Sequence, residues 1–344
     1  MNGIFAEMEA AGPTRILALR DAPTGLTAFI ALDDVTLGPA FGGIRTQPYV
    51  SVADALADVH KLASAMTLKC AIAGLAAGGG KTVVIDHPGL DRVAAFRRLG
   101  EFIEDLGGLY RCAGDLGTTE EDLLNVTATT QYCNTTGQAM GDATALTVVS
   151  GIRAAAAARG IADLAKLRVA VQGCGLIGAS VAHLLAAQGA RVTVTDVDAA
   201  LAERIAAEIS GNTIPASQFL SADVDVLSPC AIGGILNASC IADIRAWAIS
   251  GGANNQLAEP AVADLLVGRG IAFIPDFLAS SGAVIDGVCQ SIMACNPTPY
   301  LVAVEETAAD ILQQAAERGT STVVIAREIS QARIAAARTG GHAS

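Results

Sequence analysis

The sequence predicts an α/β protein of two domains, and three observations support this fold class. The chain has 344 residues, which is long for a single hydrophobic core. Its second half alternates short apolar strands with helices, the pattern of a parallel sheet with right-handed crossovers. Its composition is 52% hydrophobic with 36 glycines but only 4% aromatic residues, so we expect small side chains to bring helices close to a sheet.

The first half begins with a predicted strand over 26–34, where apolar and β-branched residues alternate. The next segment, LGPAFGGIR at 37–45, is expected to be a loop, because four of its positions are small or kinked. A helix is predicted from Ser51, which has Asp54 at the spacing of a capping box, to about Lys69.

The glycine-rich segment 74–81 is expected to lead into a strand over 82–86. An amphipathic helix over about 92–106 follows, and then a short strand and a turn in LYRCAGDLGTT at 109–119. The first domain is therefore predicted to span 1–138 and to carry both helices and strands.

The second domain is predicted over 139–299, where strands and helices alternate. After a helix over 144–160, the expected elements are strand 168–173, helix 176–189, strand 191–196, helix 199–210, strand 224–229, helix 240–248, strand 248–252, helix 260–268 and strand 271–276. Two long helices at about 300–318 and 320–338 have no strand after them. We expect the segment 300–344 to pack back on the first domain and to end in a frayed tail, GGHAS.

The segment 173–178 reads G-x-G-x-x-G, with Gly173, Gly175 and Gly178 between a predicted strand and a predicted helix. The first glycine permits a tight turn, the second lets the backbone approach a pyrophosphate, and the third lets helix and strand touch. The backbone N–H groups of Leu176 and Ile177 belong to a helix N-terminus, which favours an anion.

An acidic residue completes this dinucleotide fingerprint. Asp196 ends the next strand, 18 residues after Gly178, and is expected to bind the ribose hydroxyls. The neighbouring Asp198 adds negative charge that would repel a 2′-phosphate. The sequence therefore predicts NAD as cofactor in preference to NADP, in a Rossmann-type domain.

The segment GGGKT at 78–82 looks like the end of a phosphate-binding P-loop, but the rest of that motif is missing. Leu75 stands where the motif needs glycine, and a strand follows where it needs a helix. What remains is Lys81 beside three glycines, where desolvation by crowded backbone lowers a lysine pKa. Lys69, twelve residues earlier, could be a second cation that lowers it further.

Several ordered blocks of this sequence resemble one family. They are LGPAFGGIR, AMTLKCAIAGLAAGGGKTVV, GDLGTTEEDL, VAVQGCGLIG with VTVTDVD, SPCAIGGILN, and GGANNQLAE with IAFIPDFLASSGAVI. The chain resembles the leucine/phenylalanine/valine dehydrogenases, the L-amino-acid branch of the glutamate dehydrogenase superfamily. The resemblance implies a first domain that holds substrate, a second that holds NAD, an active site in the cleft between them, and a homo-oligomer of at least two subunits.

The resemblance also implies a reaction and its residues: L-amino acid, NAD⁺ and water give 2-oxo acid, ammonium, NADH and a proton. By position, Lys81 is the catalytic lysine, Asp115 its acidic partner, and Lys69 the anchor for the substrate carboxylate. Further implied substrate-binding residues are Gly42, Gly43, Met66, Phe41, Ala113, Val284, Gly287 and Asn255. Besides the fingerprint, the implied cofactor-binding residues are Thr147, Cys230, Ala231, Asn254 and Ser280.

This chain departs from the family pattern at three positions. Ser280 replaces an Asn that helps to hold the cofactor, and a hydroxyl can make only part of an amide's hydrogen bonds. In the side-chain pocket, Phe41 replaces a smaller aliphatic residue and Gly287 replaces a valine. Phe41 therefore narrows the pocket on one side, and Gly287 widens it on another. Glutamate enzymes carry a lysine at position 41, which disfavours glutamate as substrate. Arg111 either reaches a polar substrate tail or is a solvated arginine at a strand edge.

Each implied residue has an ordinary structural alternative. Lys69 could be a solvated charge at a helix end, and Asp115 a turn residue or the N-cap of a helix beginning near Thr118. The Asn254–Asn255 pair could form an Asx turn, and Thr147 could be a core residue.

Two other functions also remain open. One is a biosynthetic reductive aminase for an unusual 2-oxo acid, which the changes at Phe41, Ser280 and Gly287 permit. The other is a non-catalytic NAD-binding regulatory homologue, which has no need of two lysines and an aspartate near a cleft. The buried thiols expected from the eight cysteines, which form no C-x-x-C pair, favour a cytoplasmic protein without a disulfide framework.

Charge and composition exclude several classes of partner. The 22 Lys and Arg against 34 Asp and Glu give a net charge of −12, which repels polyphosphate, so we expect no nucleic acid partner. Glu7 and Glu9 occupy an N-terminus without a basic segment, and the least charged long stretch, 287–304, is interrupted by polar residues and prolines. We therefore expect no signal peptide, no membrane span and, with only four histidines, no metal site.

Overall fold

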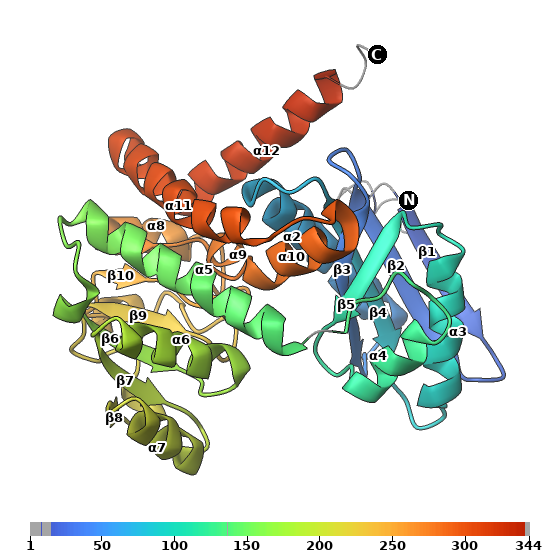
Figure 1. Cartoon of the computed structure of the whole chain (residues 1–344), viewed down its shortest axis with the longest axis horizontal. Helices are drawn as coiled ribbons and strands as arrows, with labels where there is room; N and C mark the ends of the chain where they lie inside the picture. The colour runs from blue at the N-terminus through green and yellow to red at the C-terminus, as the bar shows by residue number, and fades with distance from the viewer. Residues whose placement is uncertain (1–7, 9–14, 136, 341–344) are drawn as a thin grey trace. The chain divides into compact units, whose positions relative to one another are not determined.

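The computed structural model describes residue 8, residues 15–135 and residues 137–340, and these form two compact units. Unit 1 holds the described residues of 1–137, 286–296 and 330–344, and unit 2 holds those of 138–285 and 297–329. Each unit has its own sheet (Figure 1). The division into 1–138, 139–299 and 300–344 stays a prediction, and most of the predicted tail lies outside the described residues.

Unit 1 is built on a five-stranded mixed sheet in the order β1-β2-β4-β3-β5. Its strands are β1 (Arg15–Asp21), β2 (Leu26–Asp34), β3 (Ala40–Gln47), β4 (Gly78–Ile85) and β5 (Tyr110–Gly114). The pairs β1·β2 and β2·β4 are antiparallel, whereas β3 runs parallel to both β4 and β5. The first strand has no counterpart in the sequence-based prediction.

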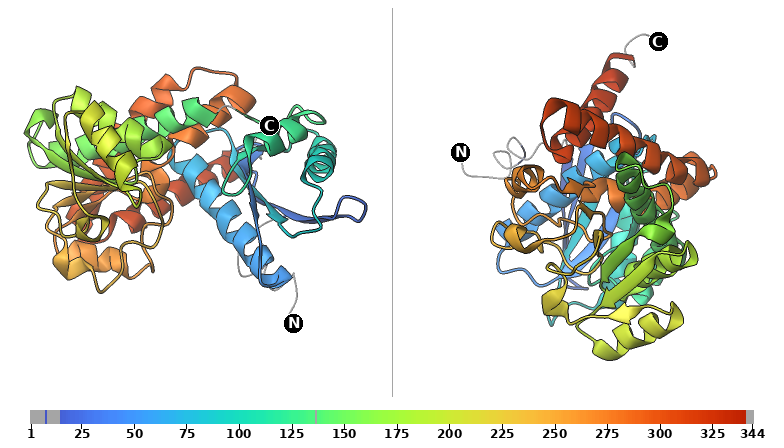
Figure 2. Two further views of the ribbon diagram at one scale, coloured as in Figure 1. Left: turned by 90° about the horizontal axis from the view of Figure 1, so that it is seen from below. Right: turned by 90° about the vertical axis from the view of Figure 1, so that its left-hand side faces the viewer.

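Helices cover both faces of this sheet (Figure 2). They are α2 (Val52–Ile72), α3 (Arg92–Glu104) and α4 (Glu120–Thr127). Helix α2 buries Val59 and Ala63 against Ala31 and Val83, whereas α3 and α4 pack with the side chains of the opposite face. Because side chains alternate along a strand, the odd-numbered residues of β4 face α2, and this is the face that carries Lys81.

The prediction of a loop at LGPAFGGIR was wrong, because most of this segment is a strand. The strand expected over 82–86 is present but begins earlier, at Gly78, within the second glycine-rich segment. LGPAFGGIR contributes β3, in the interior of the sheet, and the three glycines before Lys81 already belong to β4. Tertiary contacts explain why glycine occurs in them. A Cβ atom on Gly42 would lie 1.7 Å from the carbonyl oxygen of Gly80, and one on Gly78 would lie 1.8 Å from that of Asp34.

Unit 2 contains a parallel sheet of six strands in the order β11-β10-β9-β6-β7-β8. The strands are β6 (Arg168–Gln172), β7 (Arg191–Thr195), β8 (Asn212–Thr213), β9 (Val226–Pro229), β10 (Ala248–Ile249) and β11 (Ala272–Phe273). Read from β8, this is the doubly wound order 3-2-1-4-5-6 of dinucleotide-binding folds. The predicted α/β class with a Rossmann-type sheet is confirmed.

Most predicted helices of the second half are present. The helices are α5 (Gly137–Ala158), α6 (Leu176–Ala187), α7 (Ala199–Glu208), α8 (Val262–Gly268), α9 (Asp276–Ala279), α10 (Gly282–Val288), α11 (Thr298–Arg318) and α12 (Thr322–Gly340), and a π-helical turn at Cys289–Met293 follows α10. The helix predicted over 240–248 was wrong. Only a 3₁₀ turn forms at Ile241–Asp243, because Ile244, Ala246 and Ala248 are buried alternately, in an extended chain.

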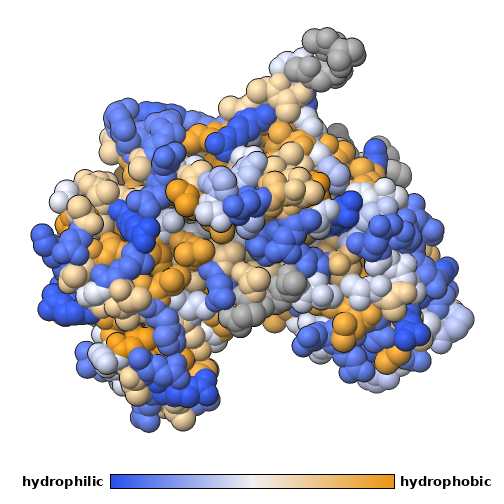
Figure 3. Space-filling view, in the orientation of Figure 1, coloured by the Kyte–Doolittle hydropathy of each residue, from blue (hydrophilic) through white to orange (hydrophobic). Residues whose placement is uncertain are grey.

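On the face shown in Figure 3, hydrophilic and hydrophobic residues are intermixed in both units. Among the described residues, none of the helices combines the length and the hydrophobicity that a membrane span requires.

Candidate active site

Strand pairing brings the predicted catalytic residues of unit 1 to one face of its sheet. Phe41 on β3 lies beside Gly79 on β4 and Arg111 on β5. Because side chains alternate, the residues two positions further along these strands, which include Lys81 and Ala113, point to the same face. Asp115 directly follows β5 on that side.

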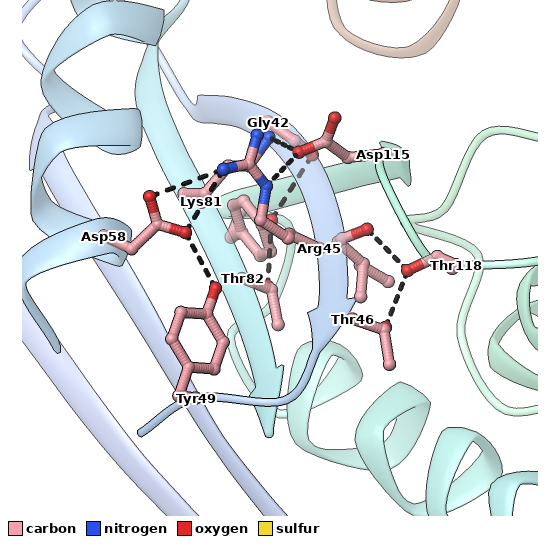
Figure 4. A network of polar contacts seen from close by, with 11 residues as sticks. Gly42, Arg45, Thr46, Tyr49, Asp58, Lys81, Thr82, Asp115 and Thr118 are labelled. Carbon is pink, nitrogen blue, oxygen red and sulfur yellow. Dashed lines mark hydrogen bonds and ion pairs between the residues drawn. The ribbon is translucent and has the colours of Figure 1, made fainter. Parts of the chain in front are cut away.

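Lys81 and Asp115 form an ion pair (Figure 4). The Lys81 Nζ lies 2.7 Å from Asp115 Oδ2, and the side chains are 7% and 24% exposed. Gly43 leaves the room for this pair, because a Cβ atom there would lie 3.1 Å from Lys81 Nζ and 2.8 Å from Asp115 Cβ. The preceding glycine, Gly42, lies instead against the backbone of Gly80, so the two glycines make room for different neighbours.

Burial and charge act in opposite directions on these two groups. Burial lowers the pKa of the Lys81 amine, and the Asp115 carboxylate only partly opposes this effect. Burial alone would raise the pKa of Asp115, but the positive charges of Lys81 and Arg45 outweigh it and bring that pKa to about 2. Asp115 is therefore ionised at neutral pH, and Lys81 loses its proton more readily than an exposed lysine.

Three polar side chains that the sequence analysis did not single out form a series of contacts that begins at Asp115. Arg45 donates from Nε to Asp115 Oδ2 at 3.1 Å and from Nη1 to Asp58 Oδ2 at 3.2 Å. Tyr49 donates its hydroxyl to the same oxygen of Asp58 at 2.7 Å (Figure 4). Arg45 lies two residues after Gly43, so the alternation of a strand could have found it, had LGPAFGGIR been interpreted as a strand.

The loop after β5 holds Asp115 in a turn. The N–H of Thr118 donates to the carbonyl of Asp115 at 3.1 Å, and its hydroxyl donates to the carbonyl of Ile44 at 2.6 Å. The N-cap of α4 is Thr119, so the alternative of Asp115 as N-cap was wrong and that of a turn residue is confirmed.

Helix α2 brings Lys69 and Met66 to the same face of the sheet. Gly79 permits this close approach, because a Cβ atom there would lie 2.1 Å from the backbone nitrogen of Thr67. Lys69 is 8% exposed in the last turn of α2, which excludes the alternative of a solvated charge. Its role as carboxylate anchor stays a prediction.

In the predicted side-chain pocket, Phe41 fills the space that Gly287 leaves. The Phe41 side chain is buried, and a Cβ atom on Gly287 would lie 2.4 Å from Phe41 Cζ. Ala113 and Val284 are also buried, the latter three residues before Gly287 on α10. The Arg111 guanidinium stacks on the ring of Tyr132, with its Cζ 4.8 Å from the ring centroid, at the edge strand of the sheet.

This contact predicts that Phe41 and Gly287 are energetically coupled. Gly287→Ala should destabilise the protein by about 1–3 kcal/mol, because the added methyl group overpacks a buried ring. Phe41→Leu should suppress that cost when the two changes are combined. Denaturant unfolding of the single and double variants measures the coupling.

Gly268→Ala is the matched control, since an added Cβ there meets no described atom within 4 Å. It should leave the free energy of unfolding unchanged or slightly higher. Additive effects of Phe41→Leu and Gly287→Ala would contradict the contact.

In unit 2, the glycine turn after β6 has the shape that a pyrophosphate needs. Gly173 has φ +90°, and a Cβ atom on Gly178 would lie 1.8 Å from the Gly173 carbonyl oxygen. Gly175 is the N-cap of α6, and a Cβ added there meets no described atom within 4 Å. The open space therefore lies directly before the helix N-terminus formed by Leu176 and Ile177, which fits the residues to a dinucleotide.

The carboxylate of Asp196 is held at the end of β7. Its Oδ2 accepts the N–H of Cys174 at 2.6 Å, and its Oδ1 accepts that of Asp198 at 2.9 Å. Asp198 is the N-cap of α7, where its carboxylate accepts two backbone N–H groups. Asp196 is thus fixed beside the glycine turn, where the ribose of a bound dinucleotide is expected.

Other residues predicted to bind the cofactor follow the carboxyl ends of neighbouring strands. Cys230 follows β9, and Ala231 packs against Gly173, whose added Cβ would lie 2.9 Å from the Ala231 Cβ. The Ser280 hydroxyl donates to Asn254 Oδ1 at 3.1 Å, and the backbone N–H of Asn255 donates to a carboxylate oxygen of Asp276. Ligands bind at this edge of doubly wound sheets.

Thr147 lies in the interior of unit 2. Its side chain is fully buried, and its hydroxyl donates to the Ala279 carbonyl at 2.7 Å and accepts the N–H of Gly282 at 3.2 Å. Its contact with a nicotinamide stays a prediction. The structure thus brings Gly43, Lys81 and Asp115 together in unit 1, and Gly173, Gly178, Asp196 and Ala231 together at the glycine turn of unit 2. The contacts of Thr147 are instead with Ala279 and Gly282.

Family models match most of the chain. Residues 13–132 match the dimerisation domain of the Glu/Leu/Phe/Val dehydrogenases, and residues 198–341 match the Glutamate/Leucine/Phenylalanine/Valine dehydrogenase model. Residues 168–224 match the NAD binding domain of 3-hydroxyacyl-CoA dehydrogenase, over the sheet that carries the glycine turn.

Individual proteins are similar over nearly the whole length. A leucine dehydrogenase from Geobacillus stearothermophilus is 38% identical over 291 residues, covering 82% of this chain and 79% of the relative. A phenylalanine dehydrogenase from Caldalkalibacillus thermarum is 35% identical over 336 residues, covering 93% and 90%. The crystal structure of L-tryptophan dehydrogenase from Nostoc punctiforme superposes with a TM-score of 0.87 at 30% identity, covering 97% of this chain and 99% of that one.

Proposed function

The chain belongs to the Glu/Leu/Phe/Val dehydrogenase family, and on that premise we propose that Lys81 and Asp115 carry out its reaction. The protein is an NAD-dependent amino-acid dehydrogenase that deaminates branched-chain or aromatic L-amino acids oxidatively and reversibly. The single observation that supports the assignment of the chemistry is the buried ion pair between Lys81 Nζ and Asp115 Oδ2, at 2.7 Å.

The chemistry that NAD supplies when bound is the acceptance of a hydride from the substrate Cα. The chain's own residues must hold the amino acid and move protons. The buried Lys69 holds the α-carboxylate, with the backbone of Gly42 and Gly43 and the Met66 side chain beside it. This anchor fixes the Cα near Lys81, and such positioning can account for much of an enzyme's rate enhancement.

Lys81 acts as general base once the substrate carries an imine. Its neutral amine takes a proton from water as the water oxygen bonds to the imine carbon. Burial lowers the pKa of Lys81, so a larger fraction of the amine is neutral near physiological pH than in an exposed lysine. Asp115, which stays ionised, accepts a hydrogen bond from the substrate ammonium group and stabilises Lys81 after it has gained the proton.

NAD would be held by the carboxyl edge of the sheet in unit 2. Gly173, Gly175 and Gly178 give its pyrophosphate access to the N-terminus of α6, and Asp196 accepts the ribose hydroxyls. The other residues in this role are Leu176, Ile177, Thr147, Cys230, Ala231, Asn254 and Ser280, with Asn255 shared with the substrate.

The state of assembly and the compartment belong to the same proposal. A homo-oligomer, at least a dimer, is supported by the match of residues 13–132 to a dimerisation domain. A cytoplasmic location is supported by the eight cysteines, all of them free thiols. The substrates are a small amino acid or 2-oxo acid and ammonium.

A substrate panel tests this function. We expect purified protein with NAD⁺ to form NADH with at least one of leucine, isoleucine, valine, phenylalanine and tryptophan, and to leave glutamate unused, because Phe41 offers no charge to a distal carboxylate. The absorbance of NADH is the measurement. If activity is seen only as NADH consumption in the presence of ammonium and a less common 2-oxo acid, the reductive aminase is favoured. NAD binding without turnover in either direction would contradict the proposal and favour a regulatory homologue.

A further inference from the structure

The Lys81–Asp115 pair is the end of a longer chain of polar contacts in unit 1 (Figure 4). Asp115 Oδ2 accepts from Lys81 Nζ at 2.7 Å and from Arg45 Nε at 3.1 Å. Asp58 Oδ2 accepts from Arg45 Nη1 at 3.2 Å and from the Tyr49 hydroxyl at 2.7 Å. The contacts therefore link α2, the segment before it, β3, β4 and the loop after β5.

We propose that Arg45 is a positioning residue for the Lys81–Asp115 pair, and that Asp58 and Tyr49 hold Arg45 in its productive orientation. The proposal rests on the proposed function, since it concerns how the two catalytic groups are kept in place. Arg45 contacts Asp115 directly, and the proposal gives it no role other than through this contact and its charge.

The position of Asp115 explains why it needs such support. It lies directly after β5, where its main chain is held by the Thr118 N–H, which donates to the Asp115 carbonyl at 3.1 Å, and by the Thr46 N–H, which donates to the Leu116 carbonyl at 2.9 Å. These contacts fix the backbone, and the orientation of the carboxylate depends on the groups that donate to it. A carboxylate oxygen that accepts from two donors on neighbouring strands can rotate little. Arg45 from β3 and Lys81 from β4 supply these two donors, and together they fix the carboxylate relative to the sheet.

Only an arginine can make both contacts from position 45 in this way. Its planar guanidinium offers Nε to Asp115 and Nη1 to Asp58, whereas the single ammonium of lysine has no such fork. Arg45 and Asp58 are 20% and 21% exposed, so water screens the network less than it screens a surface pair. Burial and the Asp58 carboxylate raise the pKa of Tyr49, so its hydroxyl remains a donor.

Arg45 and Asp58 also shift the pKa of Lys81 in opposite directions. Burial is the main reason that the pKa of Lys81 is lowered; the charge of Arg45 lowers it further, whereas Asp115 and Asp58 raise it. These groups come from β3, the loop after β5 and α2, while β2 places the uncharged Ala31 beside Lys81. Helix α2 also carries the buried Lys69.

The test is a set of variants assayed for pH dependence in oxidative deamination. Arg45→Gln should lower kcat about 10- to 100-fold, as expected for misplaced catalytic groups, with a smaller change in KM for the amino acid. In this variant the rising limb of the kcat/KM profile should move to higher pH, because the loss of a positive charge near Lys81 raises the pKa of the Lys81 amine. Asp58→Asn should move the same limb to lower pH. Arg45→Lys retains the positive charge, so the rising limb of kcat/KM should stay at the same pH as in the parent enzyme, whereas kcat should fall in part. Of these variants, Tyr49→Phe should lower kcat least.

Arg98→Gln is the matched control. Arg98 also belongs to unit 1 and pairs with Glu101 and Asp21, but on α3, which packs on the opposite face of the sheet. It should leave kcat and the pH limb unchanged. Shifts of the limb in the same direction for Arg45→Gln and Asp58→Asn, or no shift in either, would overturn the proposal, because a general loss of fold cannot produce shifts of opposite sign.

A second measurement separates this proposal from the proposed function. The rate at which acetic anhydride modifies Lys81, followed against pH by mass spectrometry, reports the titration of that amine without any turnover. Suppose that the labelling profiles of Arg45→Gln and Asp58→Asn shift in opposite directions while the parent protein is inactive. This result would support the positioning role of Arg45 and overturn the dehydrogenase function. An active parent with unshifted labelling in both variants would retain the function and overturn the role of Arg45.

Discussion

Lys81→Ala abolishes detectable turnover and leaves NAD binding intact. General acid–base catalysis by one positioned group contributes about 10²- to 10⁴-fold, and the variant also leaves Asp115 without its closest ion-pair partner. Arg45 continues to neutralise that carboxylate, so we expect unit 1 to fold. The residues proposed to bind the coenzyme lie in unit 2 and keep their own contacts.

Two measurements check this result. Titration of NADH fluorescence gives the affinity for the coenzyme, and NADH absorbance gives kcat. In the parent enzyme, kcat/KM for deamination should rise with pH, because the neutral amine is the base and protonation removes it. The limb should lie below the ordinary lysine value of 10.5, since burial lowers the pKa of Lys81. In Lys81→Ala the limb due to this group should disappear.

Lys61→Ala is the control for this experiment, because Lys61 is an exposed lysine on α2. It should retain both turnover and the pH limb. Retained turnover in Lys81→Ala would remove this lysine from the mechanism, and loss of NAD binding would show that the change had spread beyond unit 1.

Gly175→Ala and Gly178→Ala should both impair NAD binding, but for different physical reasons. At Gly178 an added Cβ would lie 1.8 Å from a backbone oxygen that cannot move away, so α6 must shift and unit 2 is destabilised. At Gly175 an added Cβ meets no described atom within 4 Å, and its φ of −70° is accessible to alanine. The methyl group there would occupy only the space intended for the pyrophosphate.

Thermal unfolding and NADH titration distinguish the two effects. Gly175→Ala should keep the parent's melting temperature and weaken NAD binding about tenfold or more, which corresponds to about 1.4 kcal/mol. Gly178→Ala should lower both the melting temperature and the affinity. An unchanged affinity in Gly175→Ala would mean that the coenzyme does not approach the backbone at this turn.

Much of unit 2 could be predicted from the sequence because local patterns specify it. Strands 168–173 and 191–196 are apolar runs, the helices between them are amphipathic, and the glycine triplet punctuates the first crossover. Such signals depend on residues near each other in the chain. The predicted helix at 240–248 failed because its apolar residues are buried in an extended segment, which composition alone does not distinguish from a helix.

Lys81 and Asp115 could be proposed as a catalytic pair from the resemblance, but the residues that surround them could not be predicted. Arg45 and Asp58 are 13 residues apart and lie on a strand and a helix, and Tyr49 adjoins them from the segment between. The contact between Phe41 and Gly287 joins residues almost at opposite ends of the chain. Distances of this kind follow from sheet register and helix packing, which a single sequence does not encode in any local pattern.

Local sequence patterns are enough to specify the α/β class, the dinucleotide turn with its acidic partner, and the presence of two lysines and an aspartate in glycine-rich surroundings. Periodicity and short motifs report these, because they arise from neighbouring residues. Three further features depend on packing between distant segments: the glycine segments form strands, Arg45 shares the oxygen that Lys81 binds, and Phe41 fills the space beside Gly287. The reason is steric: whether a glycine bends the chain or admits a neighbouring backbone depends on what packs against it.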